Sequence, residues 1–264
     1  MLMAVKNQLK ISFLSIKYAL MKEMLNKVSF ISNIVFMILN NASFILEWVI
    51  FYSLRDNFGG YTFKMVLLLW GISASTYGFA HFIFKNAFNL HETITNGKLD
   101  SYLVQPKNVL LSSITTSVEP SAIGDLLYGY IMLLLYGFTI KRFLLFTLFT
   151  ILGGCVITSL AVILSSLSFW FNKADVIADT GNGLVTSFAT YPDSIFKGFV
   201  KVLLYTIIPV GITTYIPVQV LINFNIYSFL IILGVSFIFI ILAFFIFFRG
   251  LKRYSSSNLM VARI

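Results

Sequence analysis

The chain has 264 residues, of which 58% are hydrophobic and 11% are charged, and its mean hydropathy is +0.90. In soluble domains roughly a quarter of all residues are charged. This composition therefore excludes a soluble globular fold and indicates a protein that crosses a membrane several times. The net charge of +9 fits Lys and Arg in short loops facing anionic lipid headgroups. We therefore expect membrane lipids, and no nucleic acid, as partners.

Residues 1–27 have the pattern of an amphipathic helix. Apolar side chains recur at helical spacing: Leu2, Val5, Leu9, Phe13, Ile16 and Leu20. Lysines fall together on one flank of this stripe: Lys6, Lys10 and Lys17. A signal peptide would instead bunch its charges before an unbroken apolar core. The pattern predicts a helix that lies in the membrane interface, with its lysines reaching the headgroups.

Apolar runs of about 20 residues, the length that crosses a bilayer, follow along the chain. We predict membrane spans at residues 28–52, 63–84, 121–138, 143–171 and 227–248. No separate soluble domain fits between these runs.

The segment before the last span is harder to interpret. Its apolar stretch at 199–221 is interrupted by Pro209, Gly211 and Pro217. Helical backbone at membrane depth tolerates proline only where protein or water satisfies the freed carbonyl groups. We therefore predict a re-entrant hairpin at the outer face over residues 194–222.

The fifth crossing is then predicted at residues 175–191, which are only just long enough and rather polar. The alternative is a single proline-kinked span over residues 199–222, which would leave residues 174–198 in the cytoplasm or the interface. The first interpretation gives an all-α integral membrane protein with six transmembrane helices, an N-terminal interfacial helix and a re-entrant hairpin before the last helix.

Basic residues set the orientation, because Lys and Arg favour the cytoplasmic side. With both termini inside, 13 of the 19 basic residues are cytoplasmic. The remaining six are Arg55, Lys64, Lys141, Arg142, Lys197 and Lys201. The single domain, residues 1–264, thus divides into 1–27 (interfacial helix), 28–88 (first two spans), 89–107 (cytoplasmic loop), 108–171 (third and fourth spans), 172–249 (fifth span, hairpin and sixth span) and 250–264 (cytoplasmic tail).

Residues 89–107 read NLHETITNGKLDSYLVQPK, a polar stretch between the second and third spans. Within it runs a Gly-x-Leu-Asp-x-x-Leu-x-x-Pro pattern from Gly97 to Pro106. Glycine permits a tight turn, and proline stops a helix before the chain re-enters the membrane. The simplest alternative is an ordinary interfacial loop in which Gly and Pro only mark turns.

The residues between that glycine and proline predict a short helix with a contact face. Leu99 and Leu103, four apart, would present one apolar face. Asp100 would cap the helix start or accept a hydrogen bond from a partner's backbone.

Two carboxylates lie within predicted spans. Glu47 lies inside the first apolar run, where a carboxylate costs roughly 2.5–3.5 kcal/mol unless it faces protein or water. It is a candidate to line a transport pathway and bind a cationic group, or alternatively to reach headgroups or Arg55. Asp125 is likewise a candidate to line the pathway and to make a polar contact between helices, although it follows Glu119 and Pro120, an acid and a proline typical of a helix start.

Asp179 and Asn182 fall on one helix face of the predicted fifth crossing, together with Asp175. They could form a polar stripe that lines a cavity, or simply a hydrated helix end. His81 and His91 are too few to indicate zinc binding or acid–base chemistry.

The whole pattern resembles the permease subunits of bacterial ABC-2-type exporters, of type V exporter-like fold. The resemblance rests on the topology, the Gly97–Pro106 loop pattern, Tyr191–Pro192, Ile208–Pro209 and Pro217. One departure is Gln105, where members of that family often carry a basic residue before the proline.

In that family the cytoplasmic loop is a coupling helix that docks on a separate ATPase subunit. The resemblance implies that the docking residues are Glu92, Gly97, Leu99, Asp100, Leu103 and Pro106. It further implies a second permease subunit, identical or related, and a place in the bacterial cytoplasmic membrane with both termini cytoplasmic. ATP and Mg²⁺ would be bound by the ATPase partner, and no cofactor or metal by this chain.

Catalytic motifs are missing from the sequence. It contains no Gly-x-x-x-x-Gly-Lys-Ser/Thr phosphate loop, no serine-nucleophile elbow and no His-Glu-x-x-His pattern. Cys155 is the single cysteine, which excludes an intramolecular disulfide. We therefore expect a permease of unknown substrate and no enzyme; the alternatives are an ion-gradient-driven secondary transporter, an intramembrane enzyme or a non-catalytic membrane scaffold.

Overall fold

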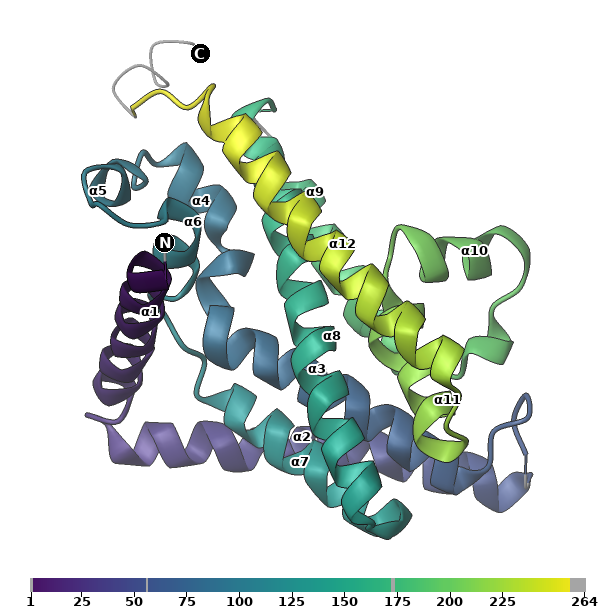
Figure 1. Ribbon diagram of the computed structural model, residues 1–264. Coiled ribbons are helices and arrows are strands. Elements are labelled where there is room, and N and C mark those ends of the chain that lie inside the picture. Colours follow the sequence, from purple (N-terminus) through teal and green to yellow (C-terminus); the bar gives the residue numbers. More distant parts are fainter. Residues whose placement is uncertain (1, 56, 172–173, 257–264) are drawn as a thin grey trace.

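The computed structural model describes residues 2–55, 57–171 and 174–256. The described secondary structure is helical apart from one isolated antiparallel bridge between Phe58 and Tyr61, which confirms the expected all-α class (Figure 1). Residues 172–173 and 257–264, which belong to the predicted fourth-to-fifth-span connection and C-terminal tail, lie outside the described residues.

The helices follow the predicted spans closely, with several short helices between them. The long helices are α1 (Leu2–Glu23), α2 (Lys27–Leu54), α3 (Phe63–Phe88), α7 (Ser121–Gly137), α8 (Ile140–Ser166), α9 (Ala174–Ala189) and α12 (Ile226–Leu251). The short α-helices are α4 (Leu90–Thr95), α5 (Asp100–Leu103), α6 (Val109–Ile114), α10 (Gly198–Thr206) and α11 (Ile216–Ile222). Single turns are η1 (Leu167–Phe169), η2 (Asp193–Ile195) and the π-helical η3 (Gly211–Tyr215).

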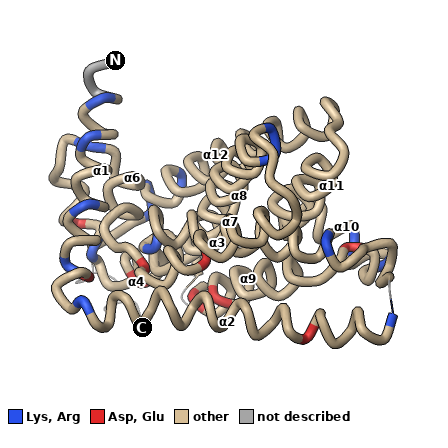
Figure 2. Tube along the Cα trace, turned by 90° about the horizontal axis from the view of Figure 1, so that it is seen from below, with Lys and Arg blue, Asp and Glu red and all other residues tan. Residues whose placement is uncertain are grey.

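The predicted amphipathic helix is present as α1. It runs across the direction of α2 (Figure 1), and a turn separates the two helices. The Asn26 side chain caps the start of α2. The apolar side chains Val5, Leu9 and Phe13 of α1 are exposed on the isolated chain, and basic residues recur along the length of this helix (Figure 2). Exposed apolar and basic groups on one surface helix are what an interfacial position requires.

Four described helical segments are long and apolar enough to cross a membrane: Lys27–Leu54, Phe63–Thr95, Ile140–Phe169 and Ile226–Leu251. The pair Gly198–Thr206 and Gly211–Ile222 passes the same test together but is bent by 73°, so the number rises to five if the pair counts as one span. α7 is apolar but has only 17 residues, and α9 has 16. The break that the prolines predicted is therefore confirmed, whereas the full set of six crossings is not established by length and composition.

Burial separates central helices from peripheral ones. In the most apolar window of α3 and of α8, 61% of residues are buried, against 11% in α2 and 17% in α12. α3 and α8 therefore form the centre, while α2 and α12 present apolar surface outward. Small residues bring the helices close: a Cβ atom added at Gly78 of α3 would lie 2.7 Å from the Ala122 carbonyl oxygen of α7.

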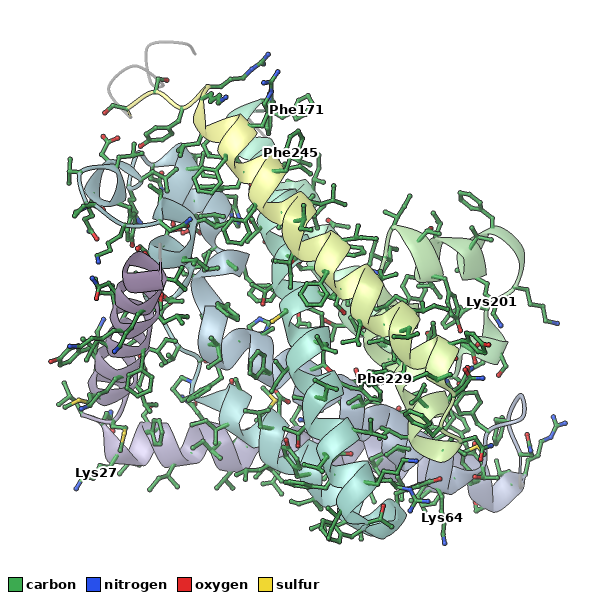
Figure 3. The ribbon with its side chains drawn as sticks, viewed as in Figure 1. Lys27, Lys64, Phe171, Lys201, Phe229 and Phe245 are labelled. Atoms are coloured by element: carbon green, nitrogen blue, oxygen red, sulfur yellow. The ribbon has the colours of Figure 1, made fainter. Side chains whose placement is uncertain are left out.

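The bundle has two distinct ends. One end, here called the loop end, carries α1, α4, α5, α6 and the C-terminal end of α12 (Figure 1). The opposite end, the hairpin end, carries α10 and the turn between α2 and α3. Lys27 lies at the loop end, whereas Lys64 and Lys201 lie at the hairpin end (Figure 3). Both ends of the described chain thus lie at the same end of the bundle, in agreement with termini on one side of the membrane.

Candidate functional site

The predicted loop 89–107 is a chain of short helices. α3 is kinked at Phe84, whose backbone angles are not helical, and α4 follows directly after Asn89. The next turn passes through Gly97, which has φ of 71° and is buried. Only glycine adopts this left-handed conformation without strain, so the expected tight turn is confirmed. α5 then begins at Asp100 and makes a single turn.

The apolar face of this loop differs from the predicted one. Leu99 is fully buried, with 0% exposure, and belongs to the hydrophobic core. Leu103 is 43% exposed and Val104 84% exposed. The prediction of a shared Leu99–Leu103 face was wrong, because the loop folds back onto its own chain and Leu99 anchors it there. The exposed apolar pair is Leu103 and Val104.

Asp100 was predicted to cap the helix start or to accept a hydrogen bond from a partner's backbone, and the second alternative stays a prediction. It does not cap α5, whose N-cap position is Leu99. Instead, the Tyr254 hydroxyl donates to Oδ1 at 2.9 Å and the Ser256 hydroxyl donates to Oδ2 at 2.8 Å. Burial and the nearby Asp100 carboxylate raise the pKa of Tyr254 to about 12, so its hydroxyl stays protonated as a donor. The C-terminal segment therefore holds the start of α5.

The exit of the loop is held by α1. Glu92 and Pro106 are both exposed. Beyond Pro106, the Asn108 backbone N–H donates to Gln8 Oε1 at 2.9 Å, and Gln8 Nε2 donates to Ser112 Oγ at 3.4 Å. The sequence did not single out Gln8, which is one of several polar residues on α1 and has no distinguishing pattern around it. Because of these contacts, α1 and the loop form one connected unit.

An intramembrane cavity of about 470 Å³ lies between α2, α3, α7 and α9. Two of the predicted pathway residues, Glu47 and Asp125, both line it. Asn41 Nδ2 donates to Asp125 Oδ1 at 2.6 Å, which confirms the expected polar contact between helices. Asp179 and Asn182 do not line the cavity: Asp179 is exposed, and Asn182 is buried elsewhere on α9.

Aromatic rings make up much of the cavity lining. Phe44 stacks on Trp70 with ring centroids 5.3 Å apart. Trp48 contacts Tyr191 at 6.2 Å between ring centroids, which brings the predicted Tyr191–Pro192 motif to the cavity. No pattern in the sequence distinguishes these rings, although two of the three tryptophans of the chain fall in helices that line the cavity.

A polar cluster at the hairpin end centres on Asp193. Its carboxylate accepts hydrogen bonds from Tyr61 at 2.9 Å and from Tyr205 at 3.0 Å, and lies 3.1 Å from Lys201 Nζ. Burial alone would raise the pKa of Asp193, but the hydrogen bonds and the charge of Lys201 outweigh it and lower the pKa below its ordinary value. The cluster ties the entry of the bent helix pair to the α2–α3 turn.

The exit of the bent pair is held at the same end of the bundle. Arg142, at the start of α8, donates from Nε to the Leu221 carbonyl at 3.4 Å. A cavity of about 370 Å³ there is lined by Tyr61 and Asn223, among others. Tyr61 therefore lies beside both the entry and the exit of the bent pair. The two ends of the pair thus lie at the same end of the bundle.

Comparison with known proteins supports the resemblance. The family model described as ABC-2 family transporter protein matches residues 37–258. No curated protein matches the chain. The matched range includes the loop, the cavity and the bent helix pair, and leaves out all of α1 and the start of α2. Because it covers most of the chain, this protein belongs to the ABC-2 family of transporter membrane proteins.

Proposed function

We propose that this chain is the permease subunit of an ATP-binding cassette exporter, which takes its energy from a separate ATPase subunit. The observation that carries the proposal is the exposed apolar pair Leu103 and Val104, placed on a braced loop at the end of the bundle. Family membership supports a transport role, and the sequence lacks a phosphate-binding loop of its own.

The docking surface has a contact part and a supporting part. Leu103 and Val104 supply apolar contact area, with Glu92 and Pro106 exposed along the same loop. Gly97, Leu99 and Asp100 support this surface. Gly97 forms the turn, Leu99 packs in the core, and Asp100 accepts hydrogen bonds from the C-terminal segment. A surface held in place before binding loses less conformational entropy when the partner docks.

For the topology, we propose six crossings, formed by α2, α3 with α4, α7, α8 with η1, α9, and α12. The bent pair is then a re-entrant hairpin, because Asp193 and Leu221 are both held at the hairpin end. Assigning the loop end to the cytoplasm agrees with the excess of Lys and Arg predicted there. Both termini are then on the cytoplasmic side of the bacterial cell membrane.

Coupling runs from the loop to the cavity through α3. α4 continues α3, and α3 contributes Trp70 and Tyr77 to the cavity lining. Two permease subunits, identical or related, bracket a pathway, and two ATPase subunits bind ATP with Mg²⁺ and dock on the loops. When those subunits close, the loops move and α3 tilts, so that the cavity changes between inward and outward states.

The test is copurification of this chain with ATP-binding cassette ATPase subunits of its own organism, coexpressed with it. Leu103→Asp with Val104→Asp places two charges on the exposed apolar pair, and we expect the ATPase to be lost from the purified complex. Leu25→Asp is the matched control, since Leu25 is 85% exposed in the α1–α2 turn, outside the loop. Retention of the ATPase by the double variant, at the level of the control, would refute docking through this loop.

A further inference from the structure

We propose that the cavity between α2, α3, α7 and α9 is a binding site for a lipophilic organic cation. The inference rests on the proposed function, since it names the class of substrate that enters the transport pathway. It stands on three properties of the lining: the sign of its charge, its aromatic rings and its size.

The charge of the lining is opposite to that of the chain. The protein carries 19 Lys and Arg against 10 Asp and Glu, yet the cavity lining contains Glu47 and Asp125 and no Lys, Arg or His. Neither carboxylate takes part in either of the ion pairs between described residues. Carboxylates at membrane depth are costly unless a positive charge or hydrogen bonds compensate them. Asn41 donates a hydrogen bond to Asp125, so what the lining lacks is a positive charge, which a cationic ligand supplies.

The rings provide the second part of the site. Trp48, Trp70, Phe44 and Tyr77 line the same space as the carboxylates. The faces of such rings attract cations and also bury apolar surface. Trp70 is only 6% exposed. An apolar body bearing a positive charge matches both the rings and the carboxylates, whereas an anion would meet two carboxylates.

The size and ligand chemistry exclude the simplest cations. About 470 Å³ lies within the range of roughly 300–1,000 Å³ that holds drug-sized ligands. A bare metal ion instead requires several clustered oxygen, nitrogen or sulfur ligands, and no group of three or more such acidic, His or Cys residues gathers in the described part of the chain. Thr186 and Ser187 of α9 also line this space, and a hydroxyl oxygen can solvate an entering positive charge.

Two ions of the same shape and opposite charge test the proposal. Tetraphenylphosphonium and tetraphenylborate are measured for equilibrium binding to the purified full-length chain in lipid nanodiscs, with empty nanodiscs subtracted. We expect saturable binding of the phosphonium and none of the borate. Equal binding of both ions, or none of the phosphonium, would overturn the proposal without any variant.

Variants locate the site. Glu47→Gln with Asp125→Asn should weaken phosphonium binding by roughly tenfold or more, which corresponds to about 1.4 kcal/mol. The control, Glu23→Gln, removes an exposed carboxylate at the end of α1 and should leave binding unchanged. Unaltered binding by a double variant that elutes as a folded particle would contradict this site.

This measurement also separates the two proposals, because it needs no ATPase. A chain that copurifies with its ATPase but does not bind the phosphonium would refute the cation site and leave the permease function standing. A chain that binds the phosphonium but never engages an ATPase would refute the permease function and leave the binding site standing.

Discussion

The Tyr254 hydroxyl donates a hydrogen bond of 2.9 Å to the Asp100 carboxylate and so joins the C-terminal segment to a loop 154 residues earlier. The same carboxylate accepts a second hydrogen bond from Ser256. At the other side of the loop, Gln8 of α1 holds the exit beside Asn108. The loop is thus braced by both terminal regions of the chain, which makes these contacts a target for variants.

Tyr254→Phe should loosen α5 without unfolding the bundle. A single hydrogen bond contributes about 1 kcal/mol, so amide hydrogen exchange in residues 100–103 should become roughly fivefold faster. The effect should be constant between pH 6 and 9, because the Tyr254 pKa of about 12 keeps its hydroxyl protonated in that range. Tyr227→Phe, an exposed tyrosine at the start of α12, is the control. Unchanged exchange in α5 would show that the tail does not hold it.

Asp193→Asn should release the bent helix pair at the hairpin end. The variant loses the charge that Lys201, Tyr61 and Tyr205 contact, and charge-assisted hydrogen bonds contribute about 1.5–3 kcal/mol. Since Lys201 is 45% exposed, its ion pair is screened and adds little. We expect about tenfold faster hydrogen exchange in α10, with Asp175→Asn, an exposed acid at the start of α9, as control.

The pH dependence of this contact has a definite sign. A lowered pKa of Asp193 in the folded chain means that its stabilising contribution is fully present above the ordinary value of 3.8. The contribution is lost as the pH falls through the lowered value. The difference between wild type and Asp193→Asn should therefore be constant near neutral pH and disappear in strong acid. A difference that grew on acidification would contradict the assignment.

Gly78→Val should destabilise the packing of α3 on α7. Any Cβ at this position would lie 2.7 Å from the Ala122 carbonyl oxygen and 2.9 Å from Asp125 Cβ, so the two helices must move apart. Overpacking of this kind costs about 1–3 kcal/mol. We therefore expect a lower midpoint temperature of thermal unfolding for the protein in detergent. Gly234→Val is the matched control on α12, where an added Cβ meets nothing within 4 Å. Equal midpoints for both variants would show that the close approach is not needed.

Cysteine labelling tests the re-entrant hairpin. In a Cys155→Ser background, single cysteines at Ile195 and Asn223 lie at the two ends of the bent pair. A membrane-impermeant maleimide should label both positions from the outside of intact cells, and a cysteine at Leu103 only after the membrane is opened. Labelling of Ile195 and Asn223 from opposite sides would mean that the bent pair is a crossing.

Local patterns in the sequence predicted the helices well, because membrane spans depend on long apolar runs. The N-terminal helix, the four long apolar helices and the break at Pro209 all follow from spacing and composition. The contact face of the loop was not predictable in the same way. Whether Leu99 points outward or into the core depends on how the loop folds back, and i to i+4 spacing carries no such information.

Long-range polar contacts could not be predicted from the sequence either. Asp193 was not selected, because its partner Tyr61 lies 132 residues away and the two share no sequence pattern. Glu47 and Asp125 could be selected singly, as costly carboxylates in apolar runs, but their common cavity depends on how α2 packs on α7. Asp179 and Asn182 lie one to two turns before Thr186 on the same side of α9, and the cavity lining on this helix begins only at Thr186.

The most direct test of coupling is the rate of ATP hydrolysis by the partner ATPase in proteoliposomes. It is measured for the ATPase alone, with the wild-type chain, and with the chain carrying Leu103→Asp and Val104→Asp. We predict that the wild-type chain changes the rate and that the variant leaves it at the value of the ATPase alone. A variant that changed the rate as much as the wild-type chain would contradict coupling through this loop.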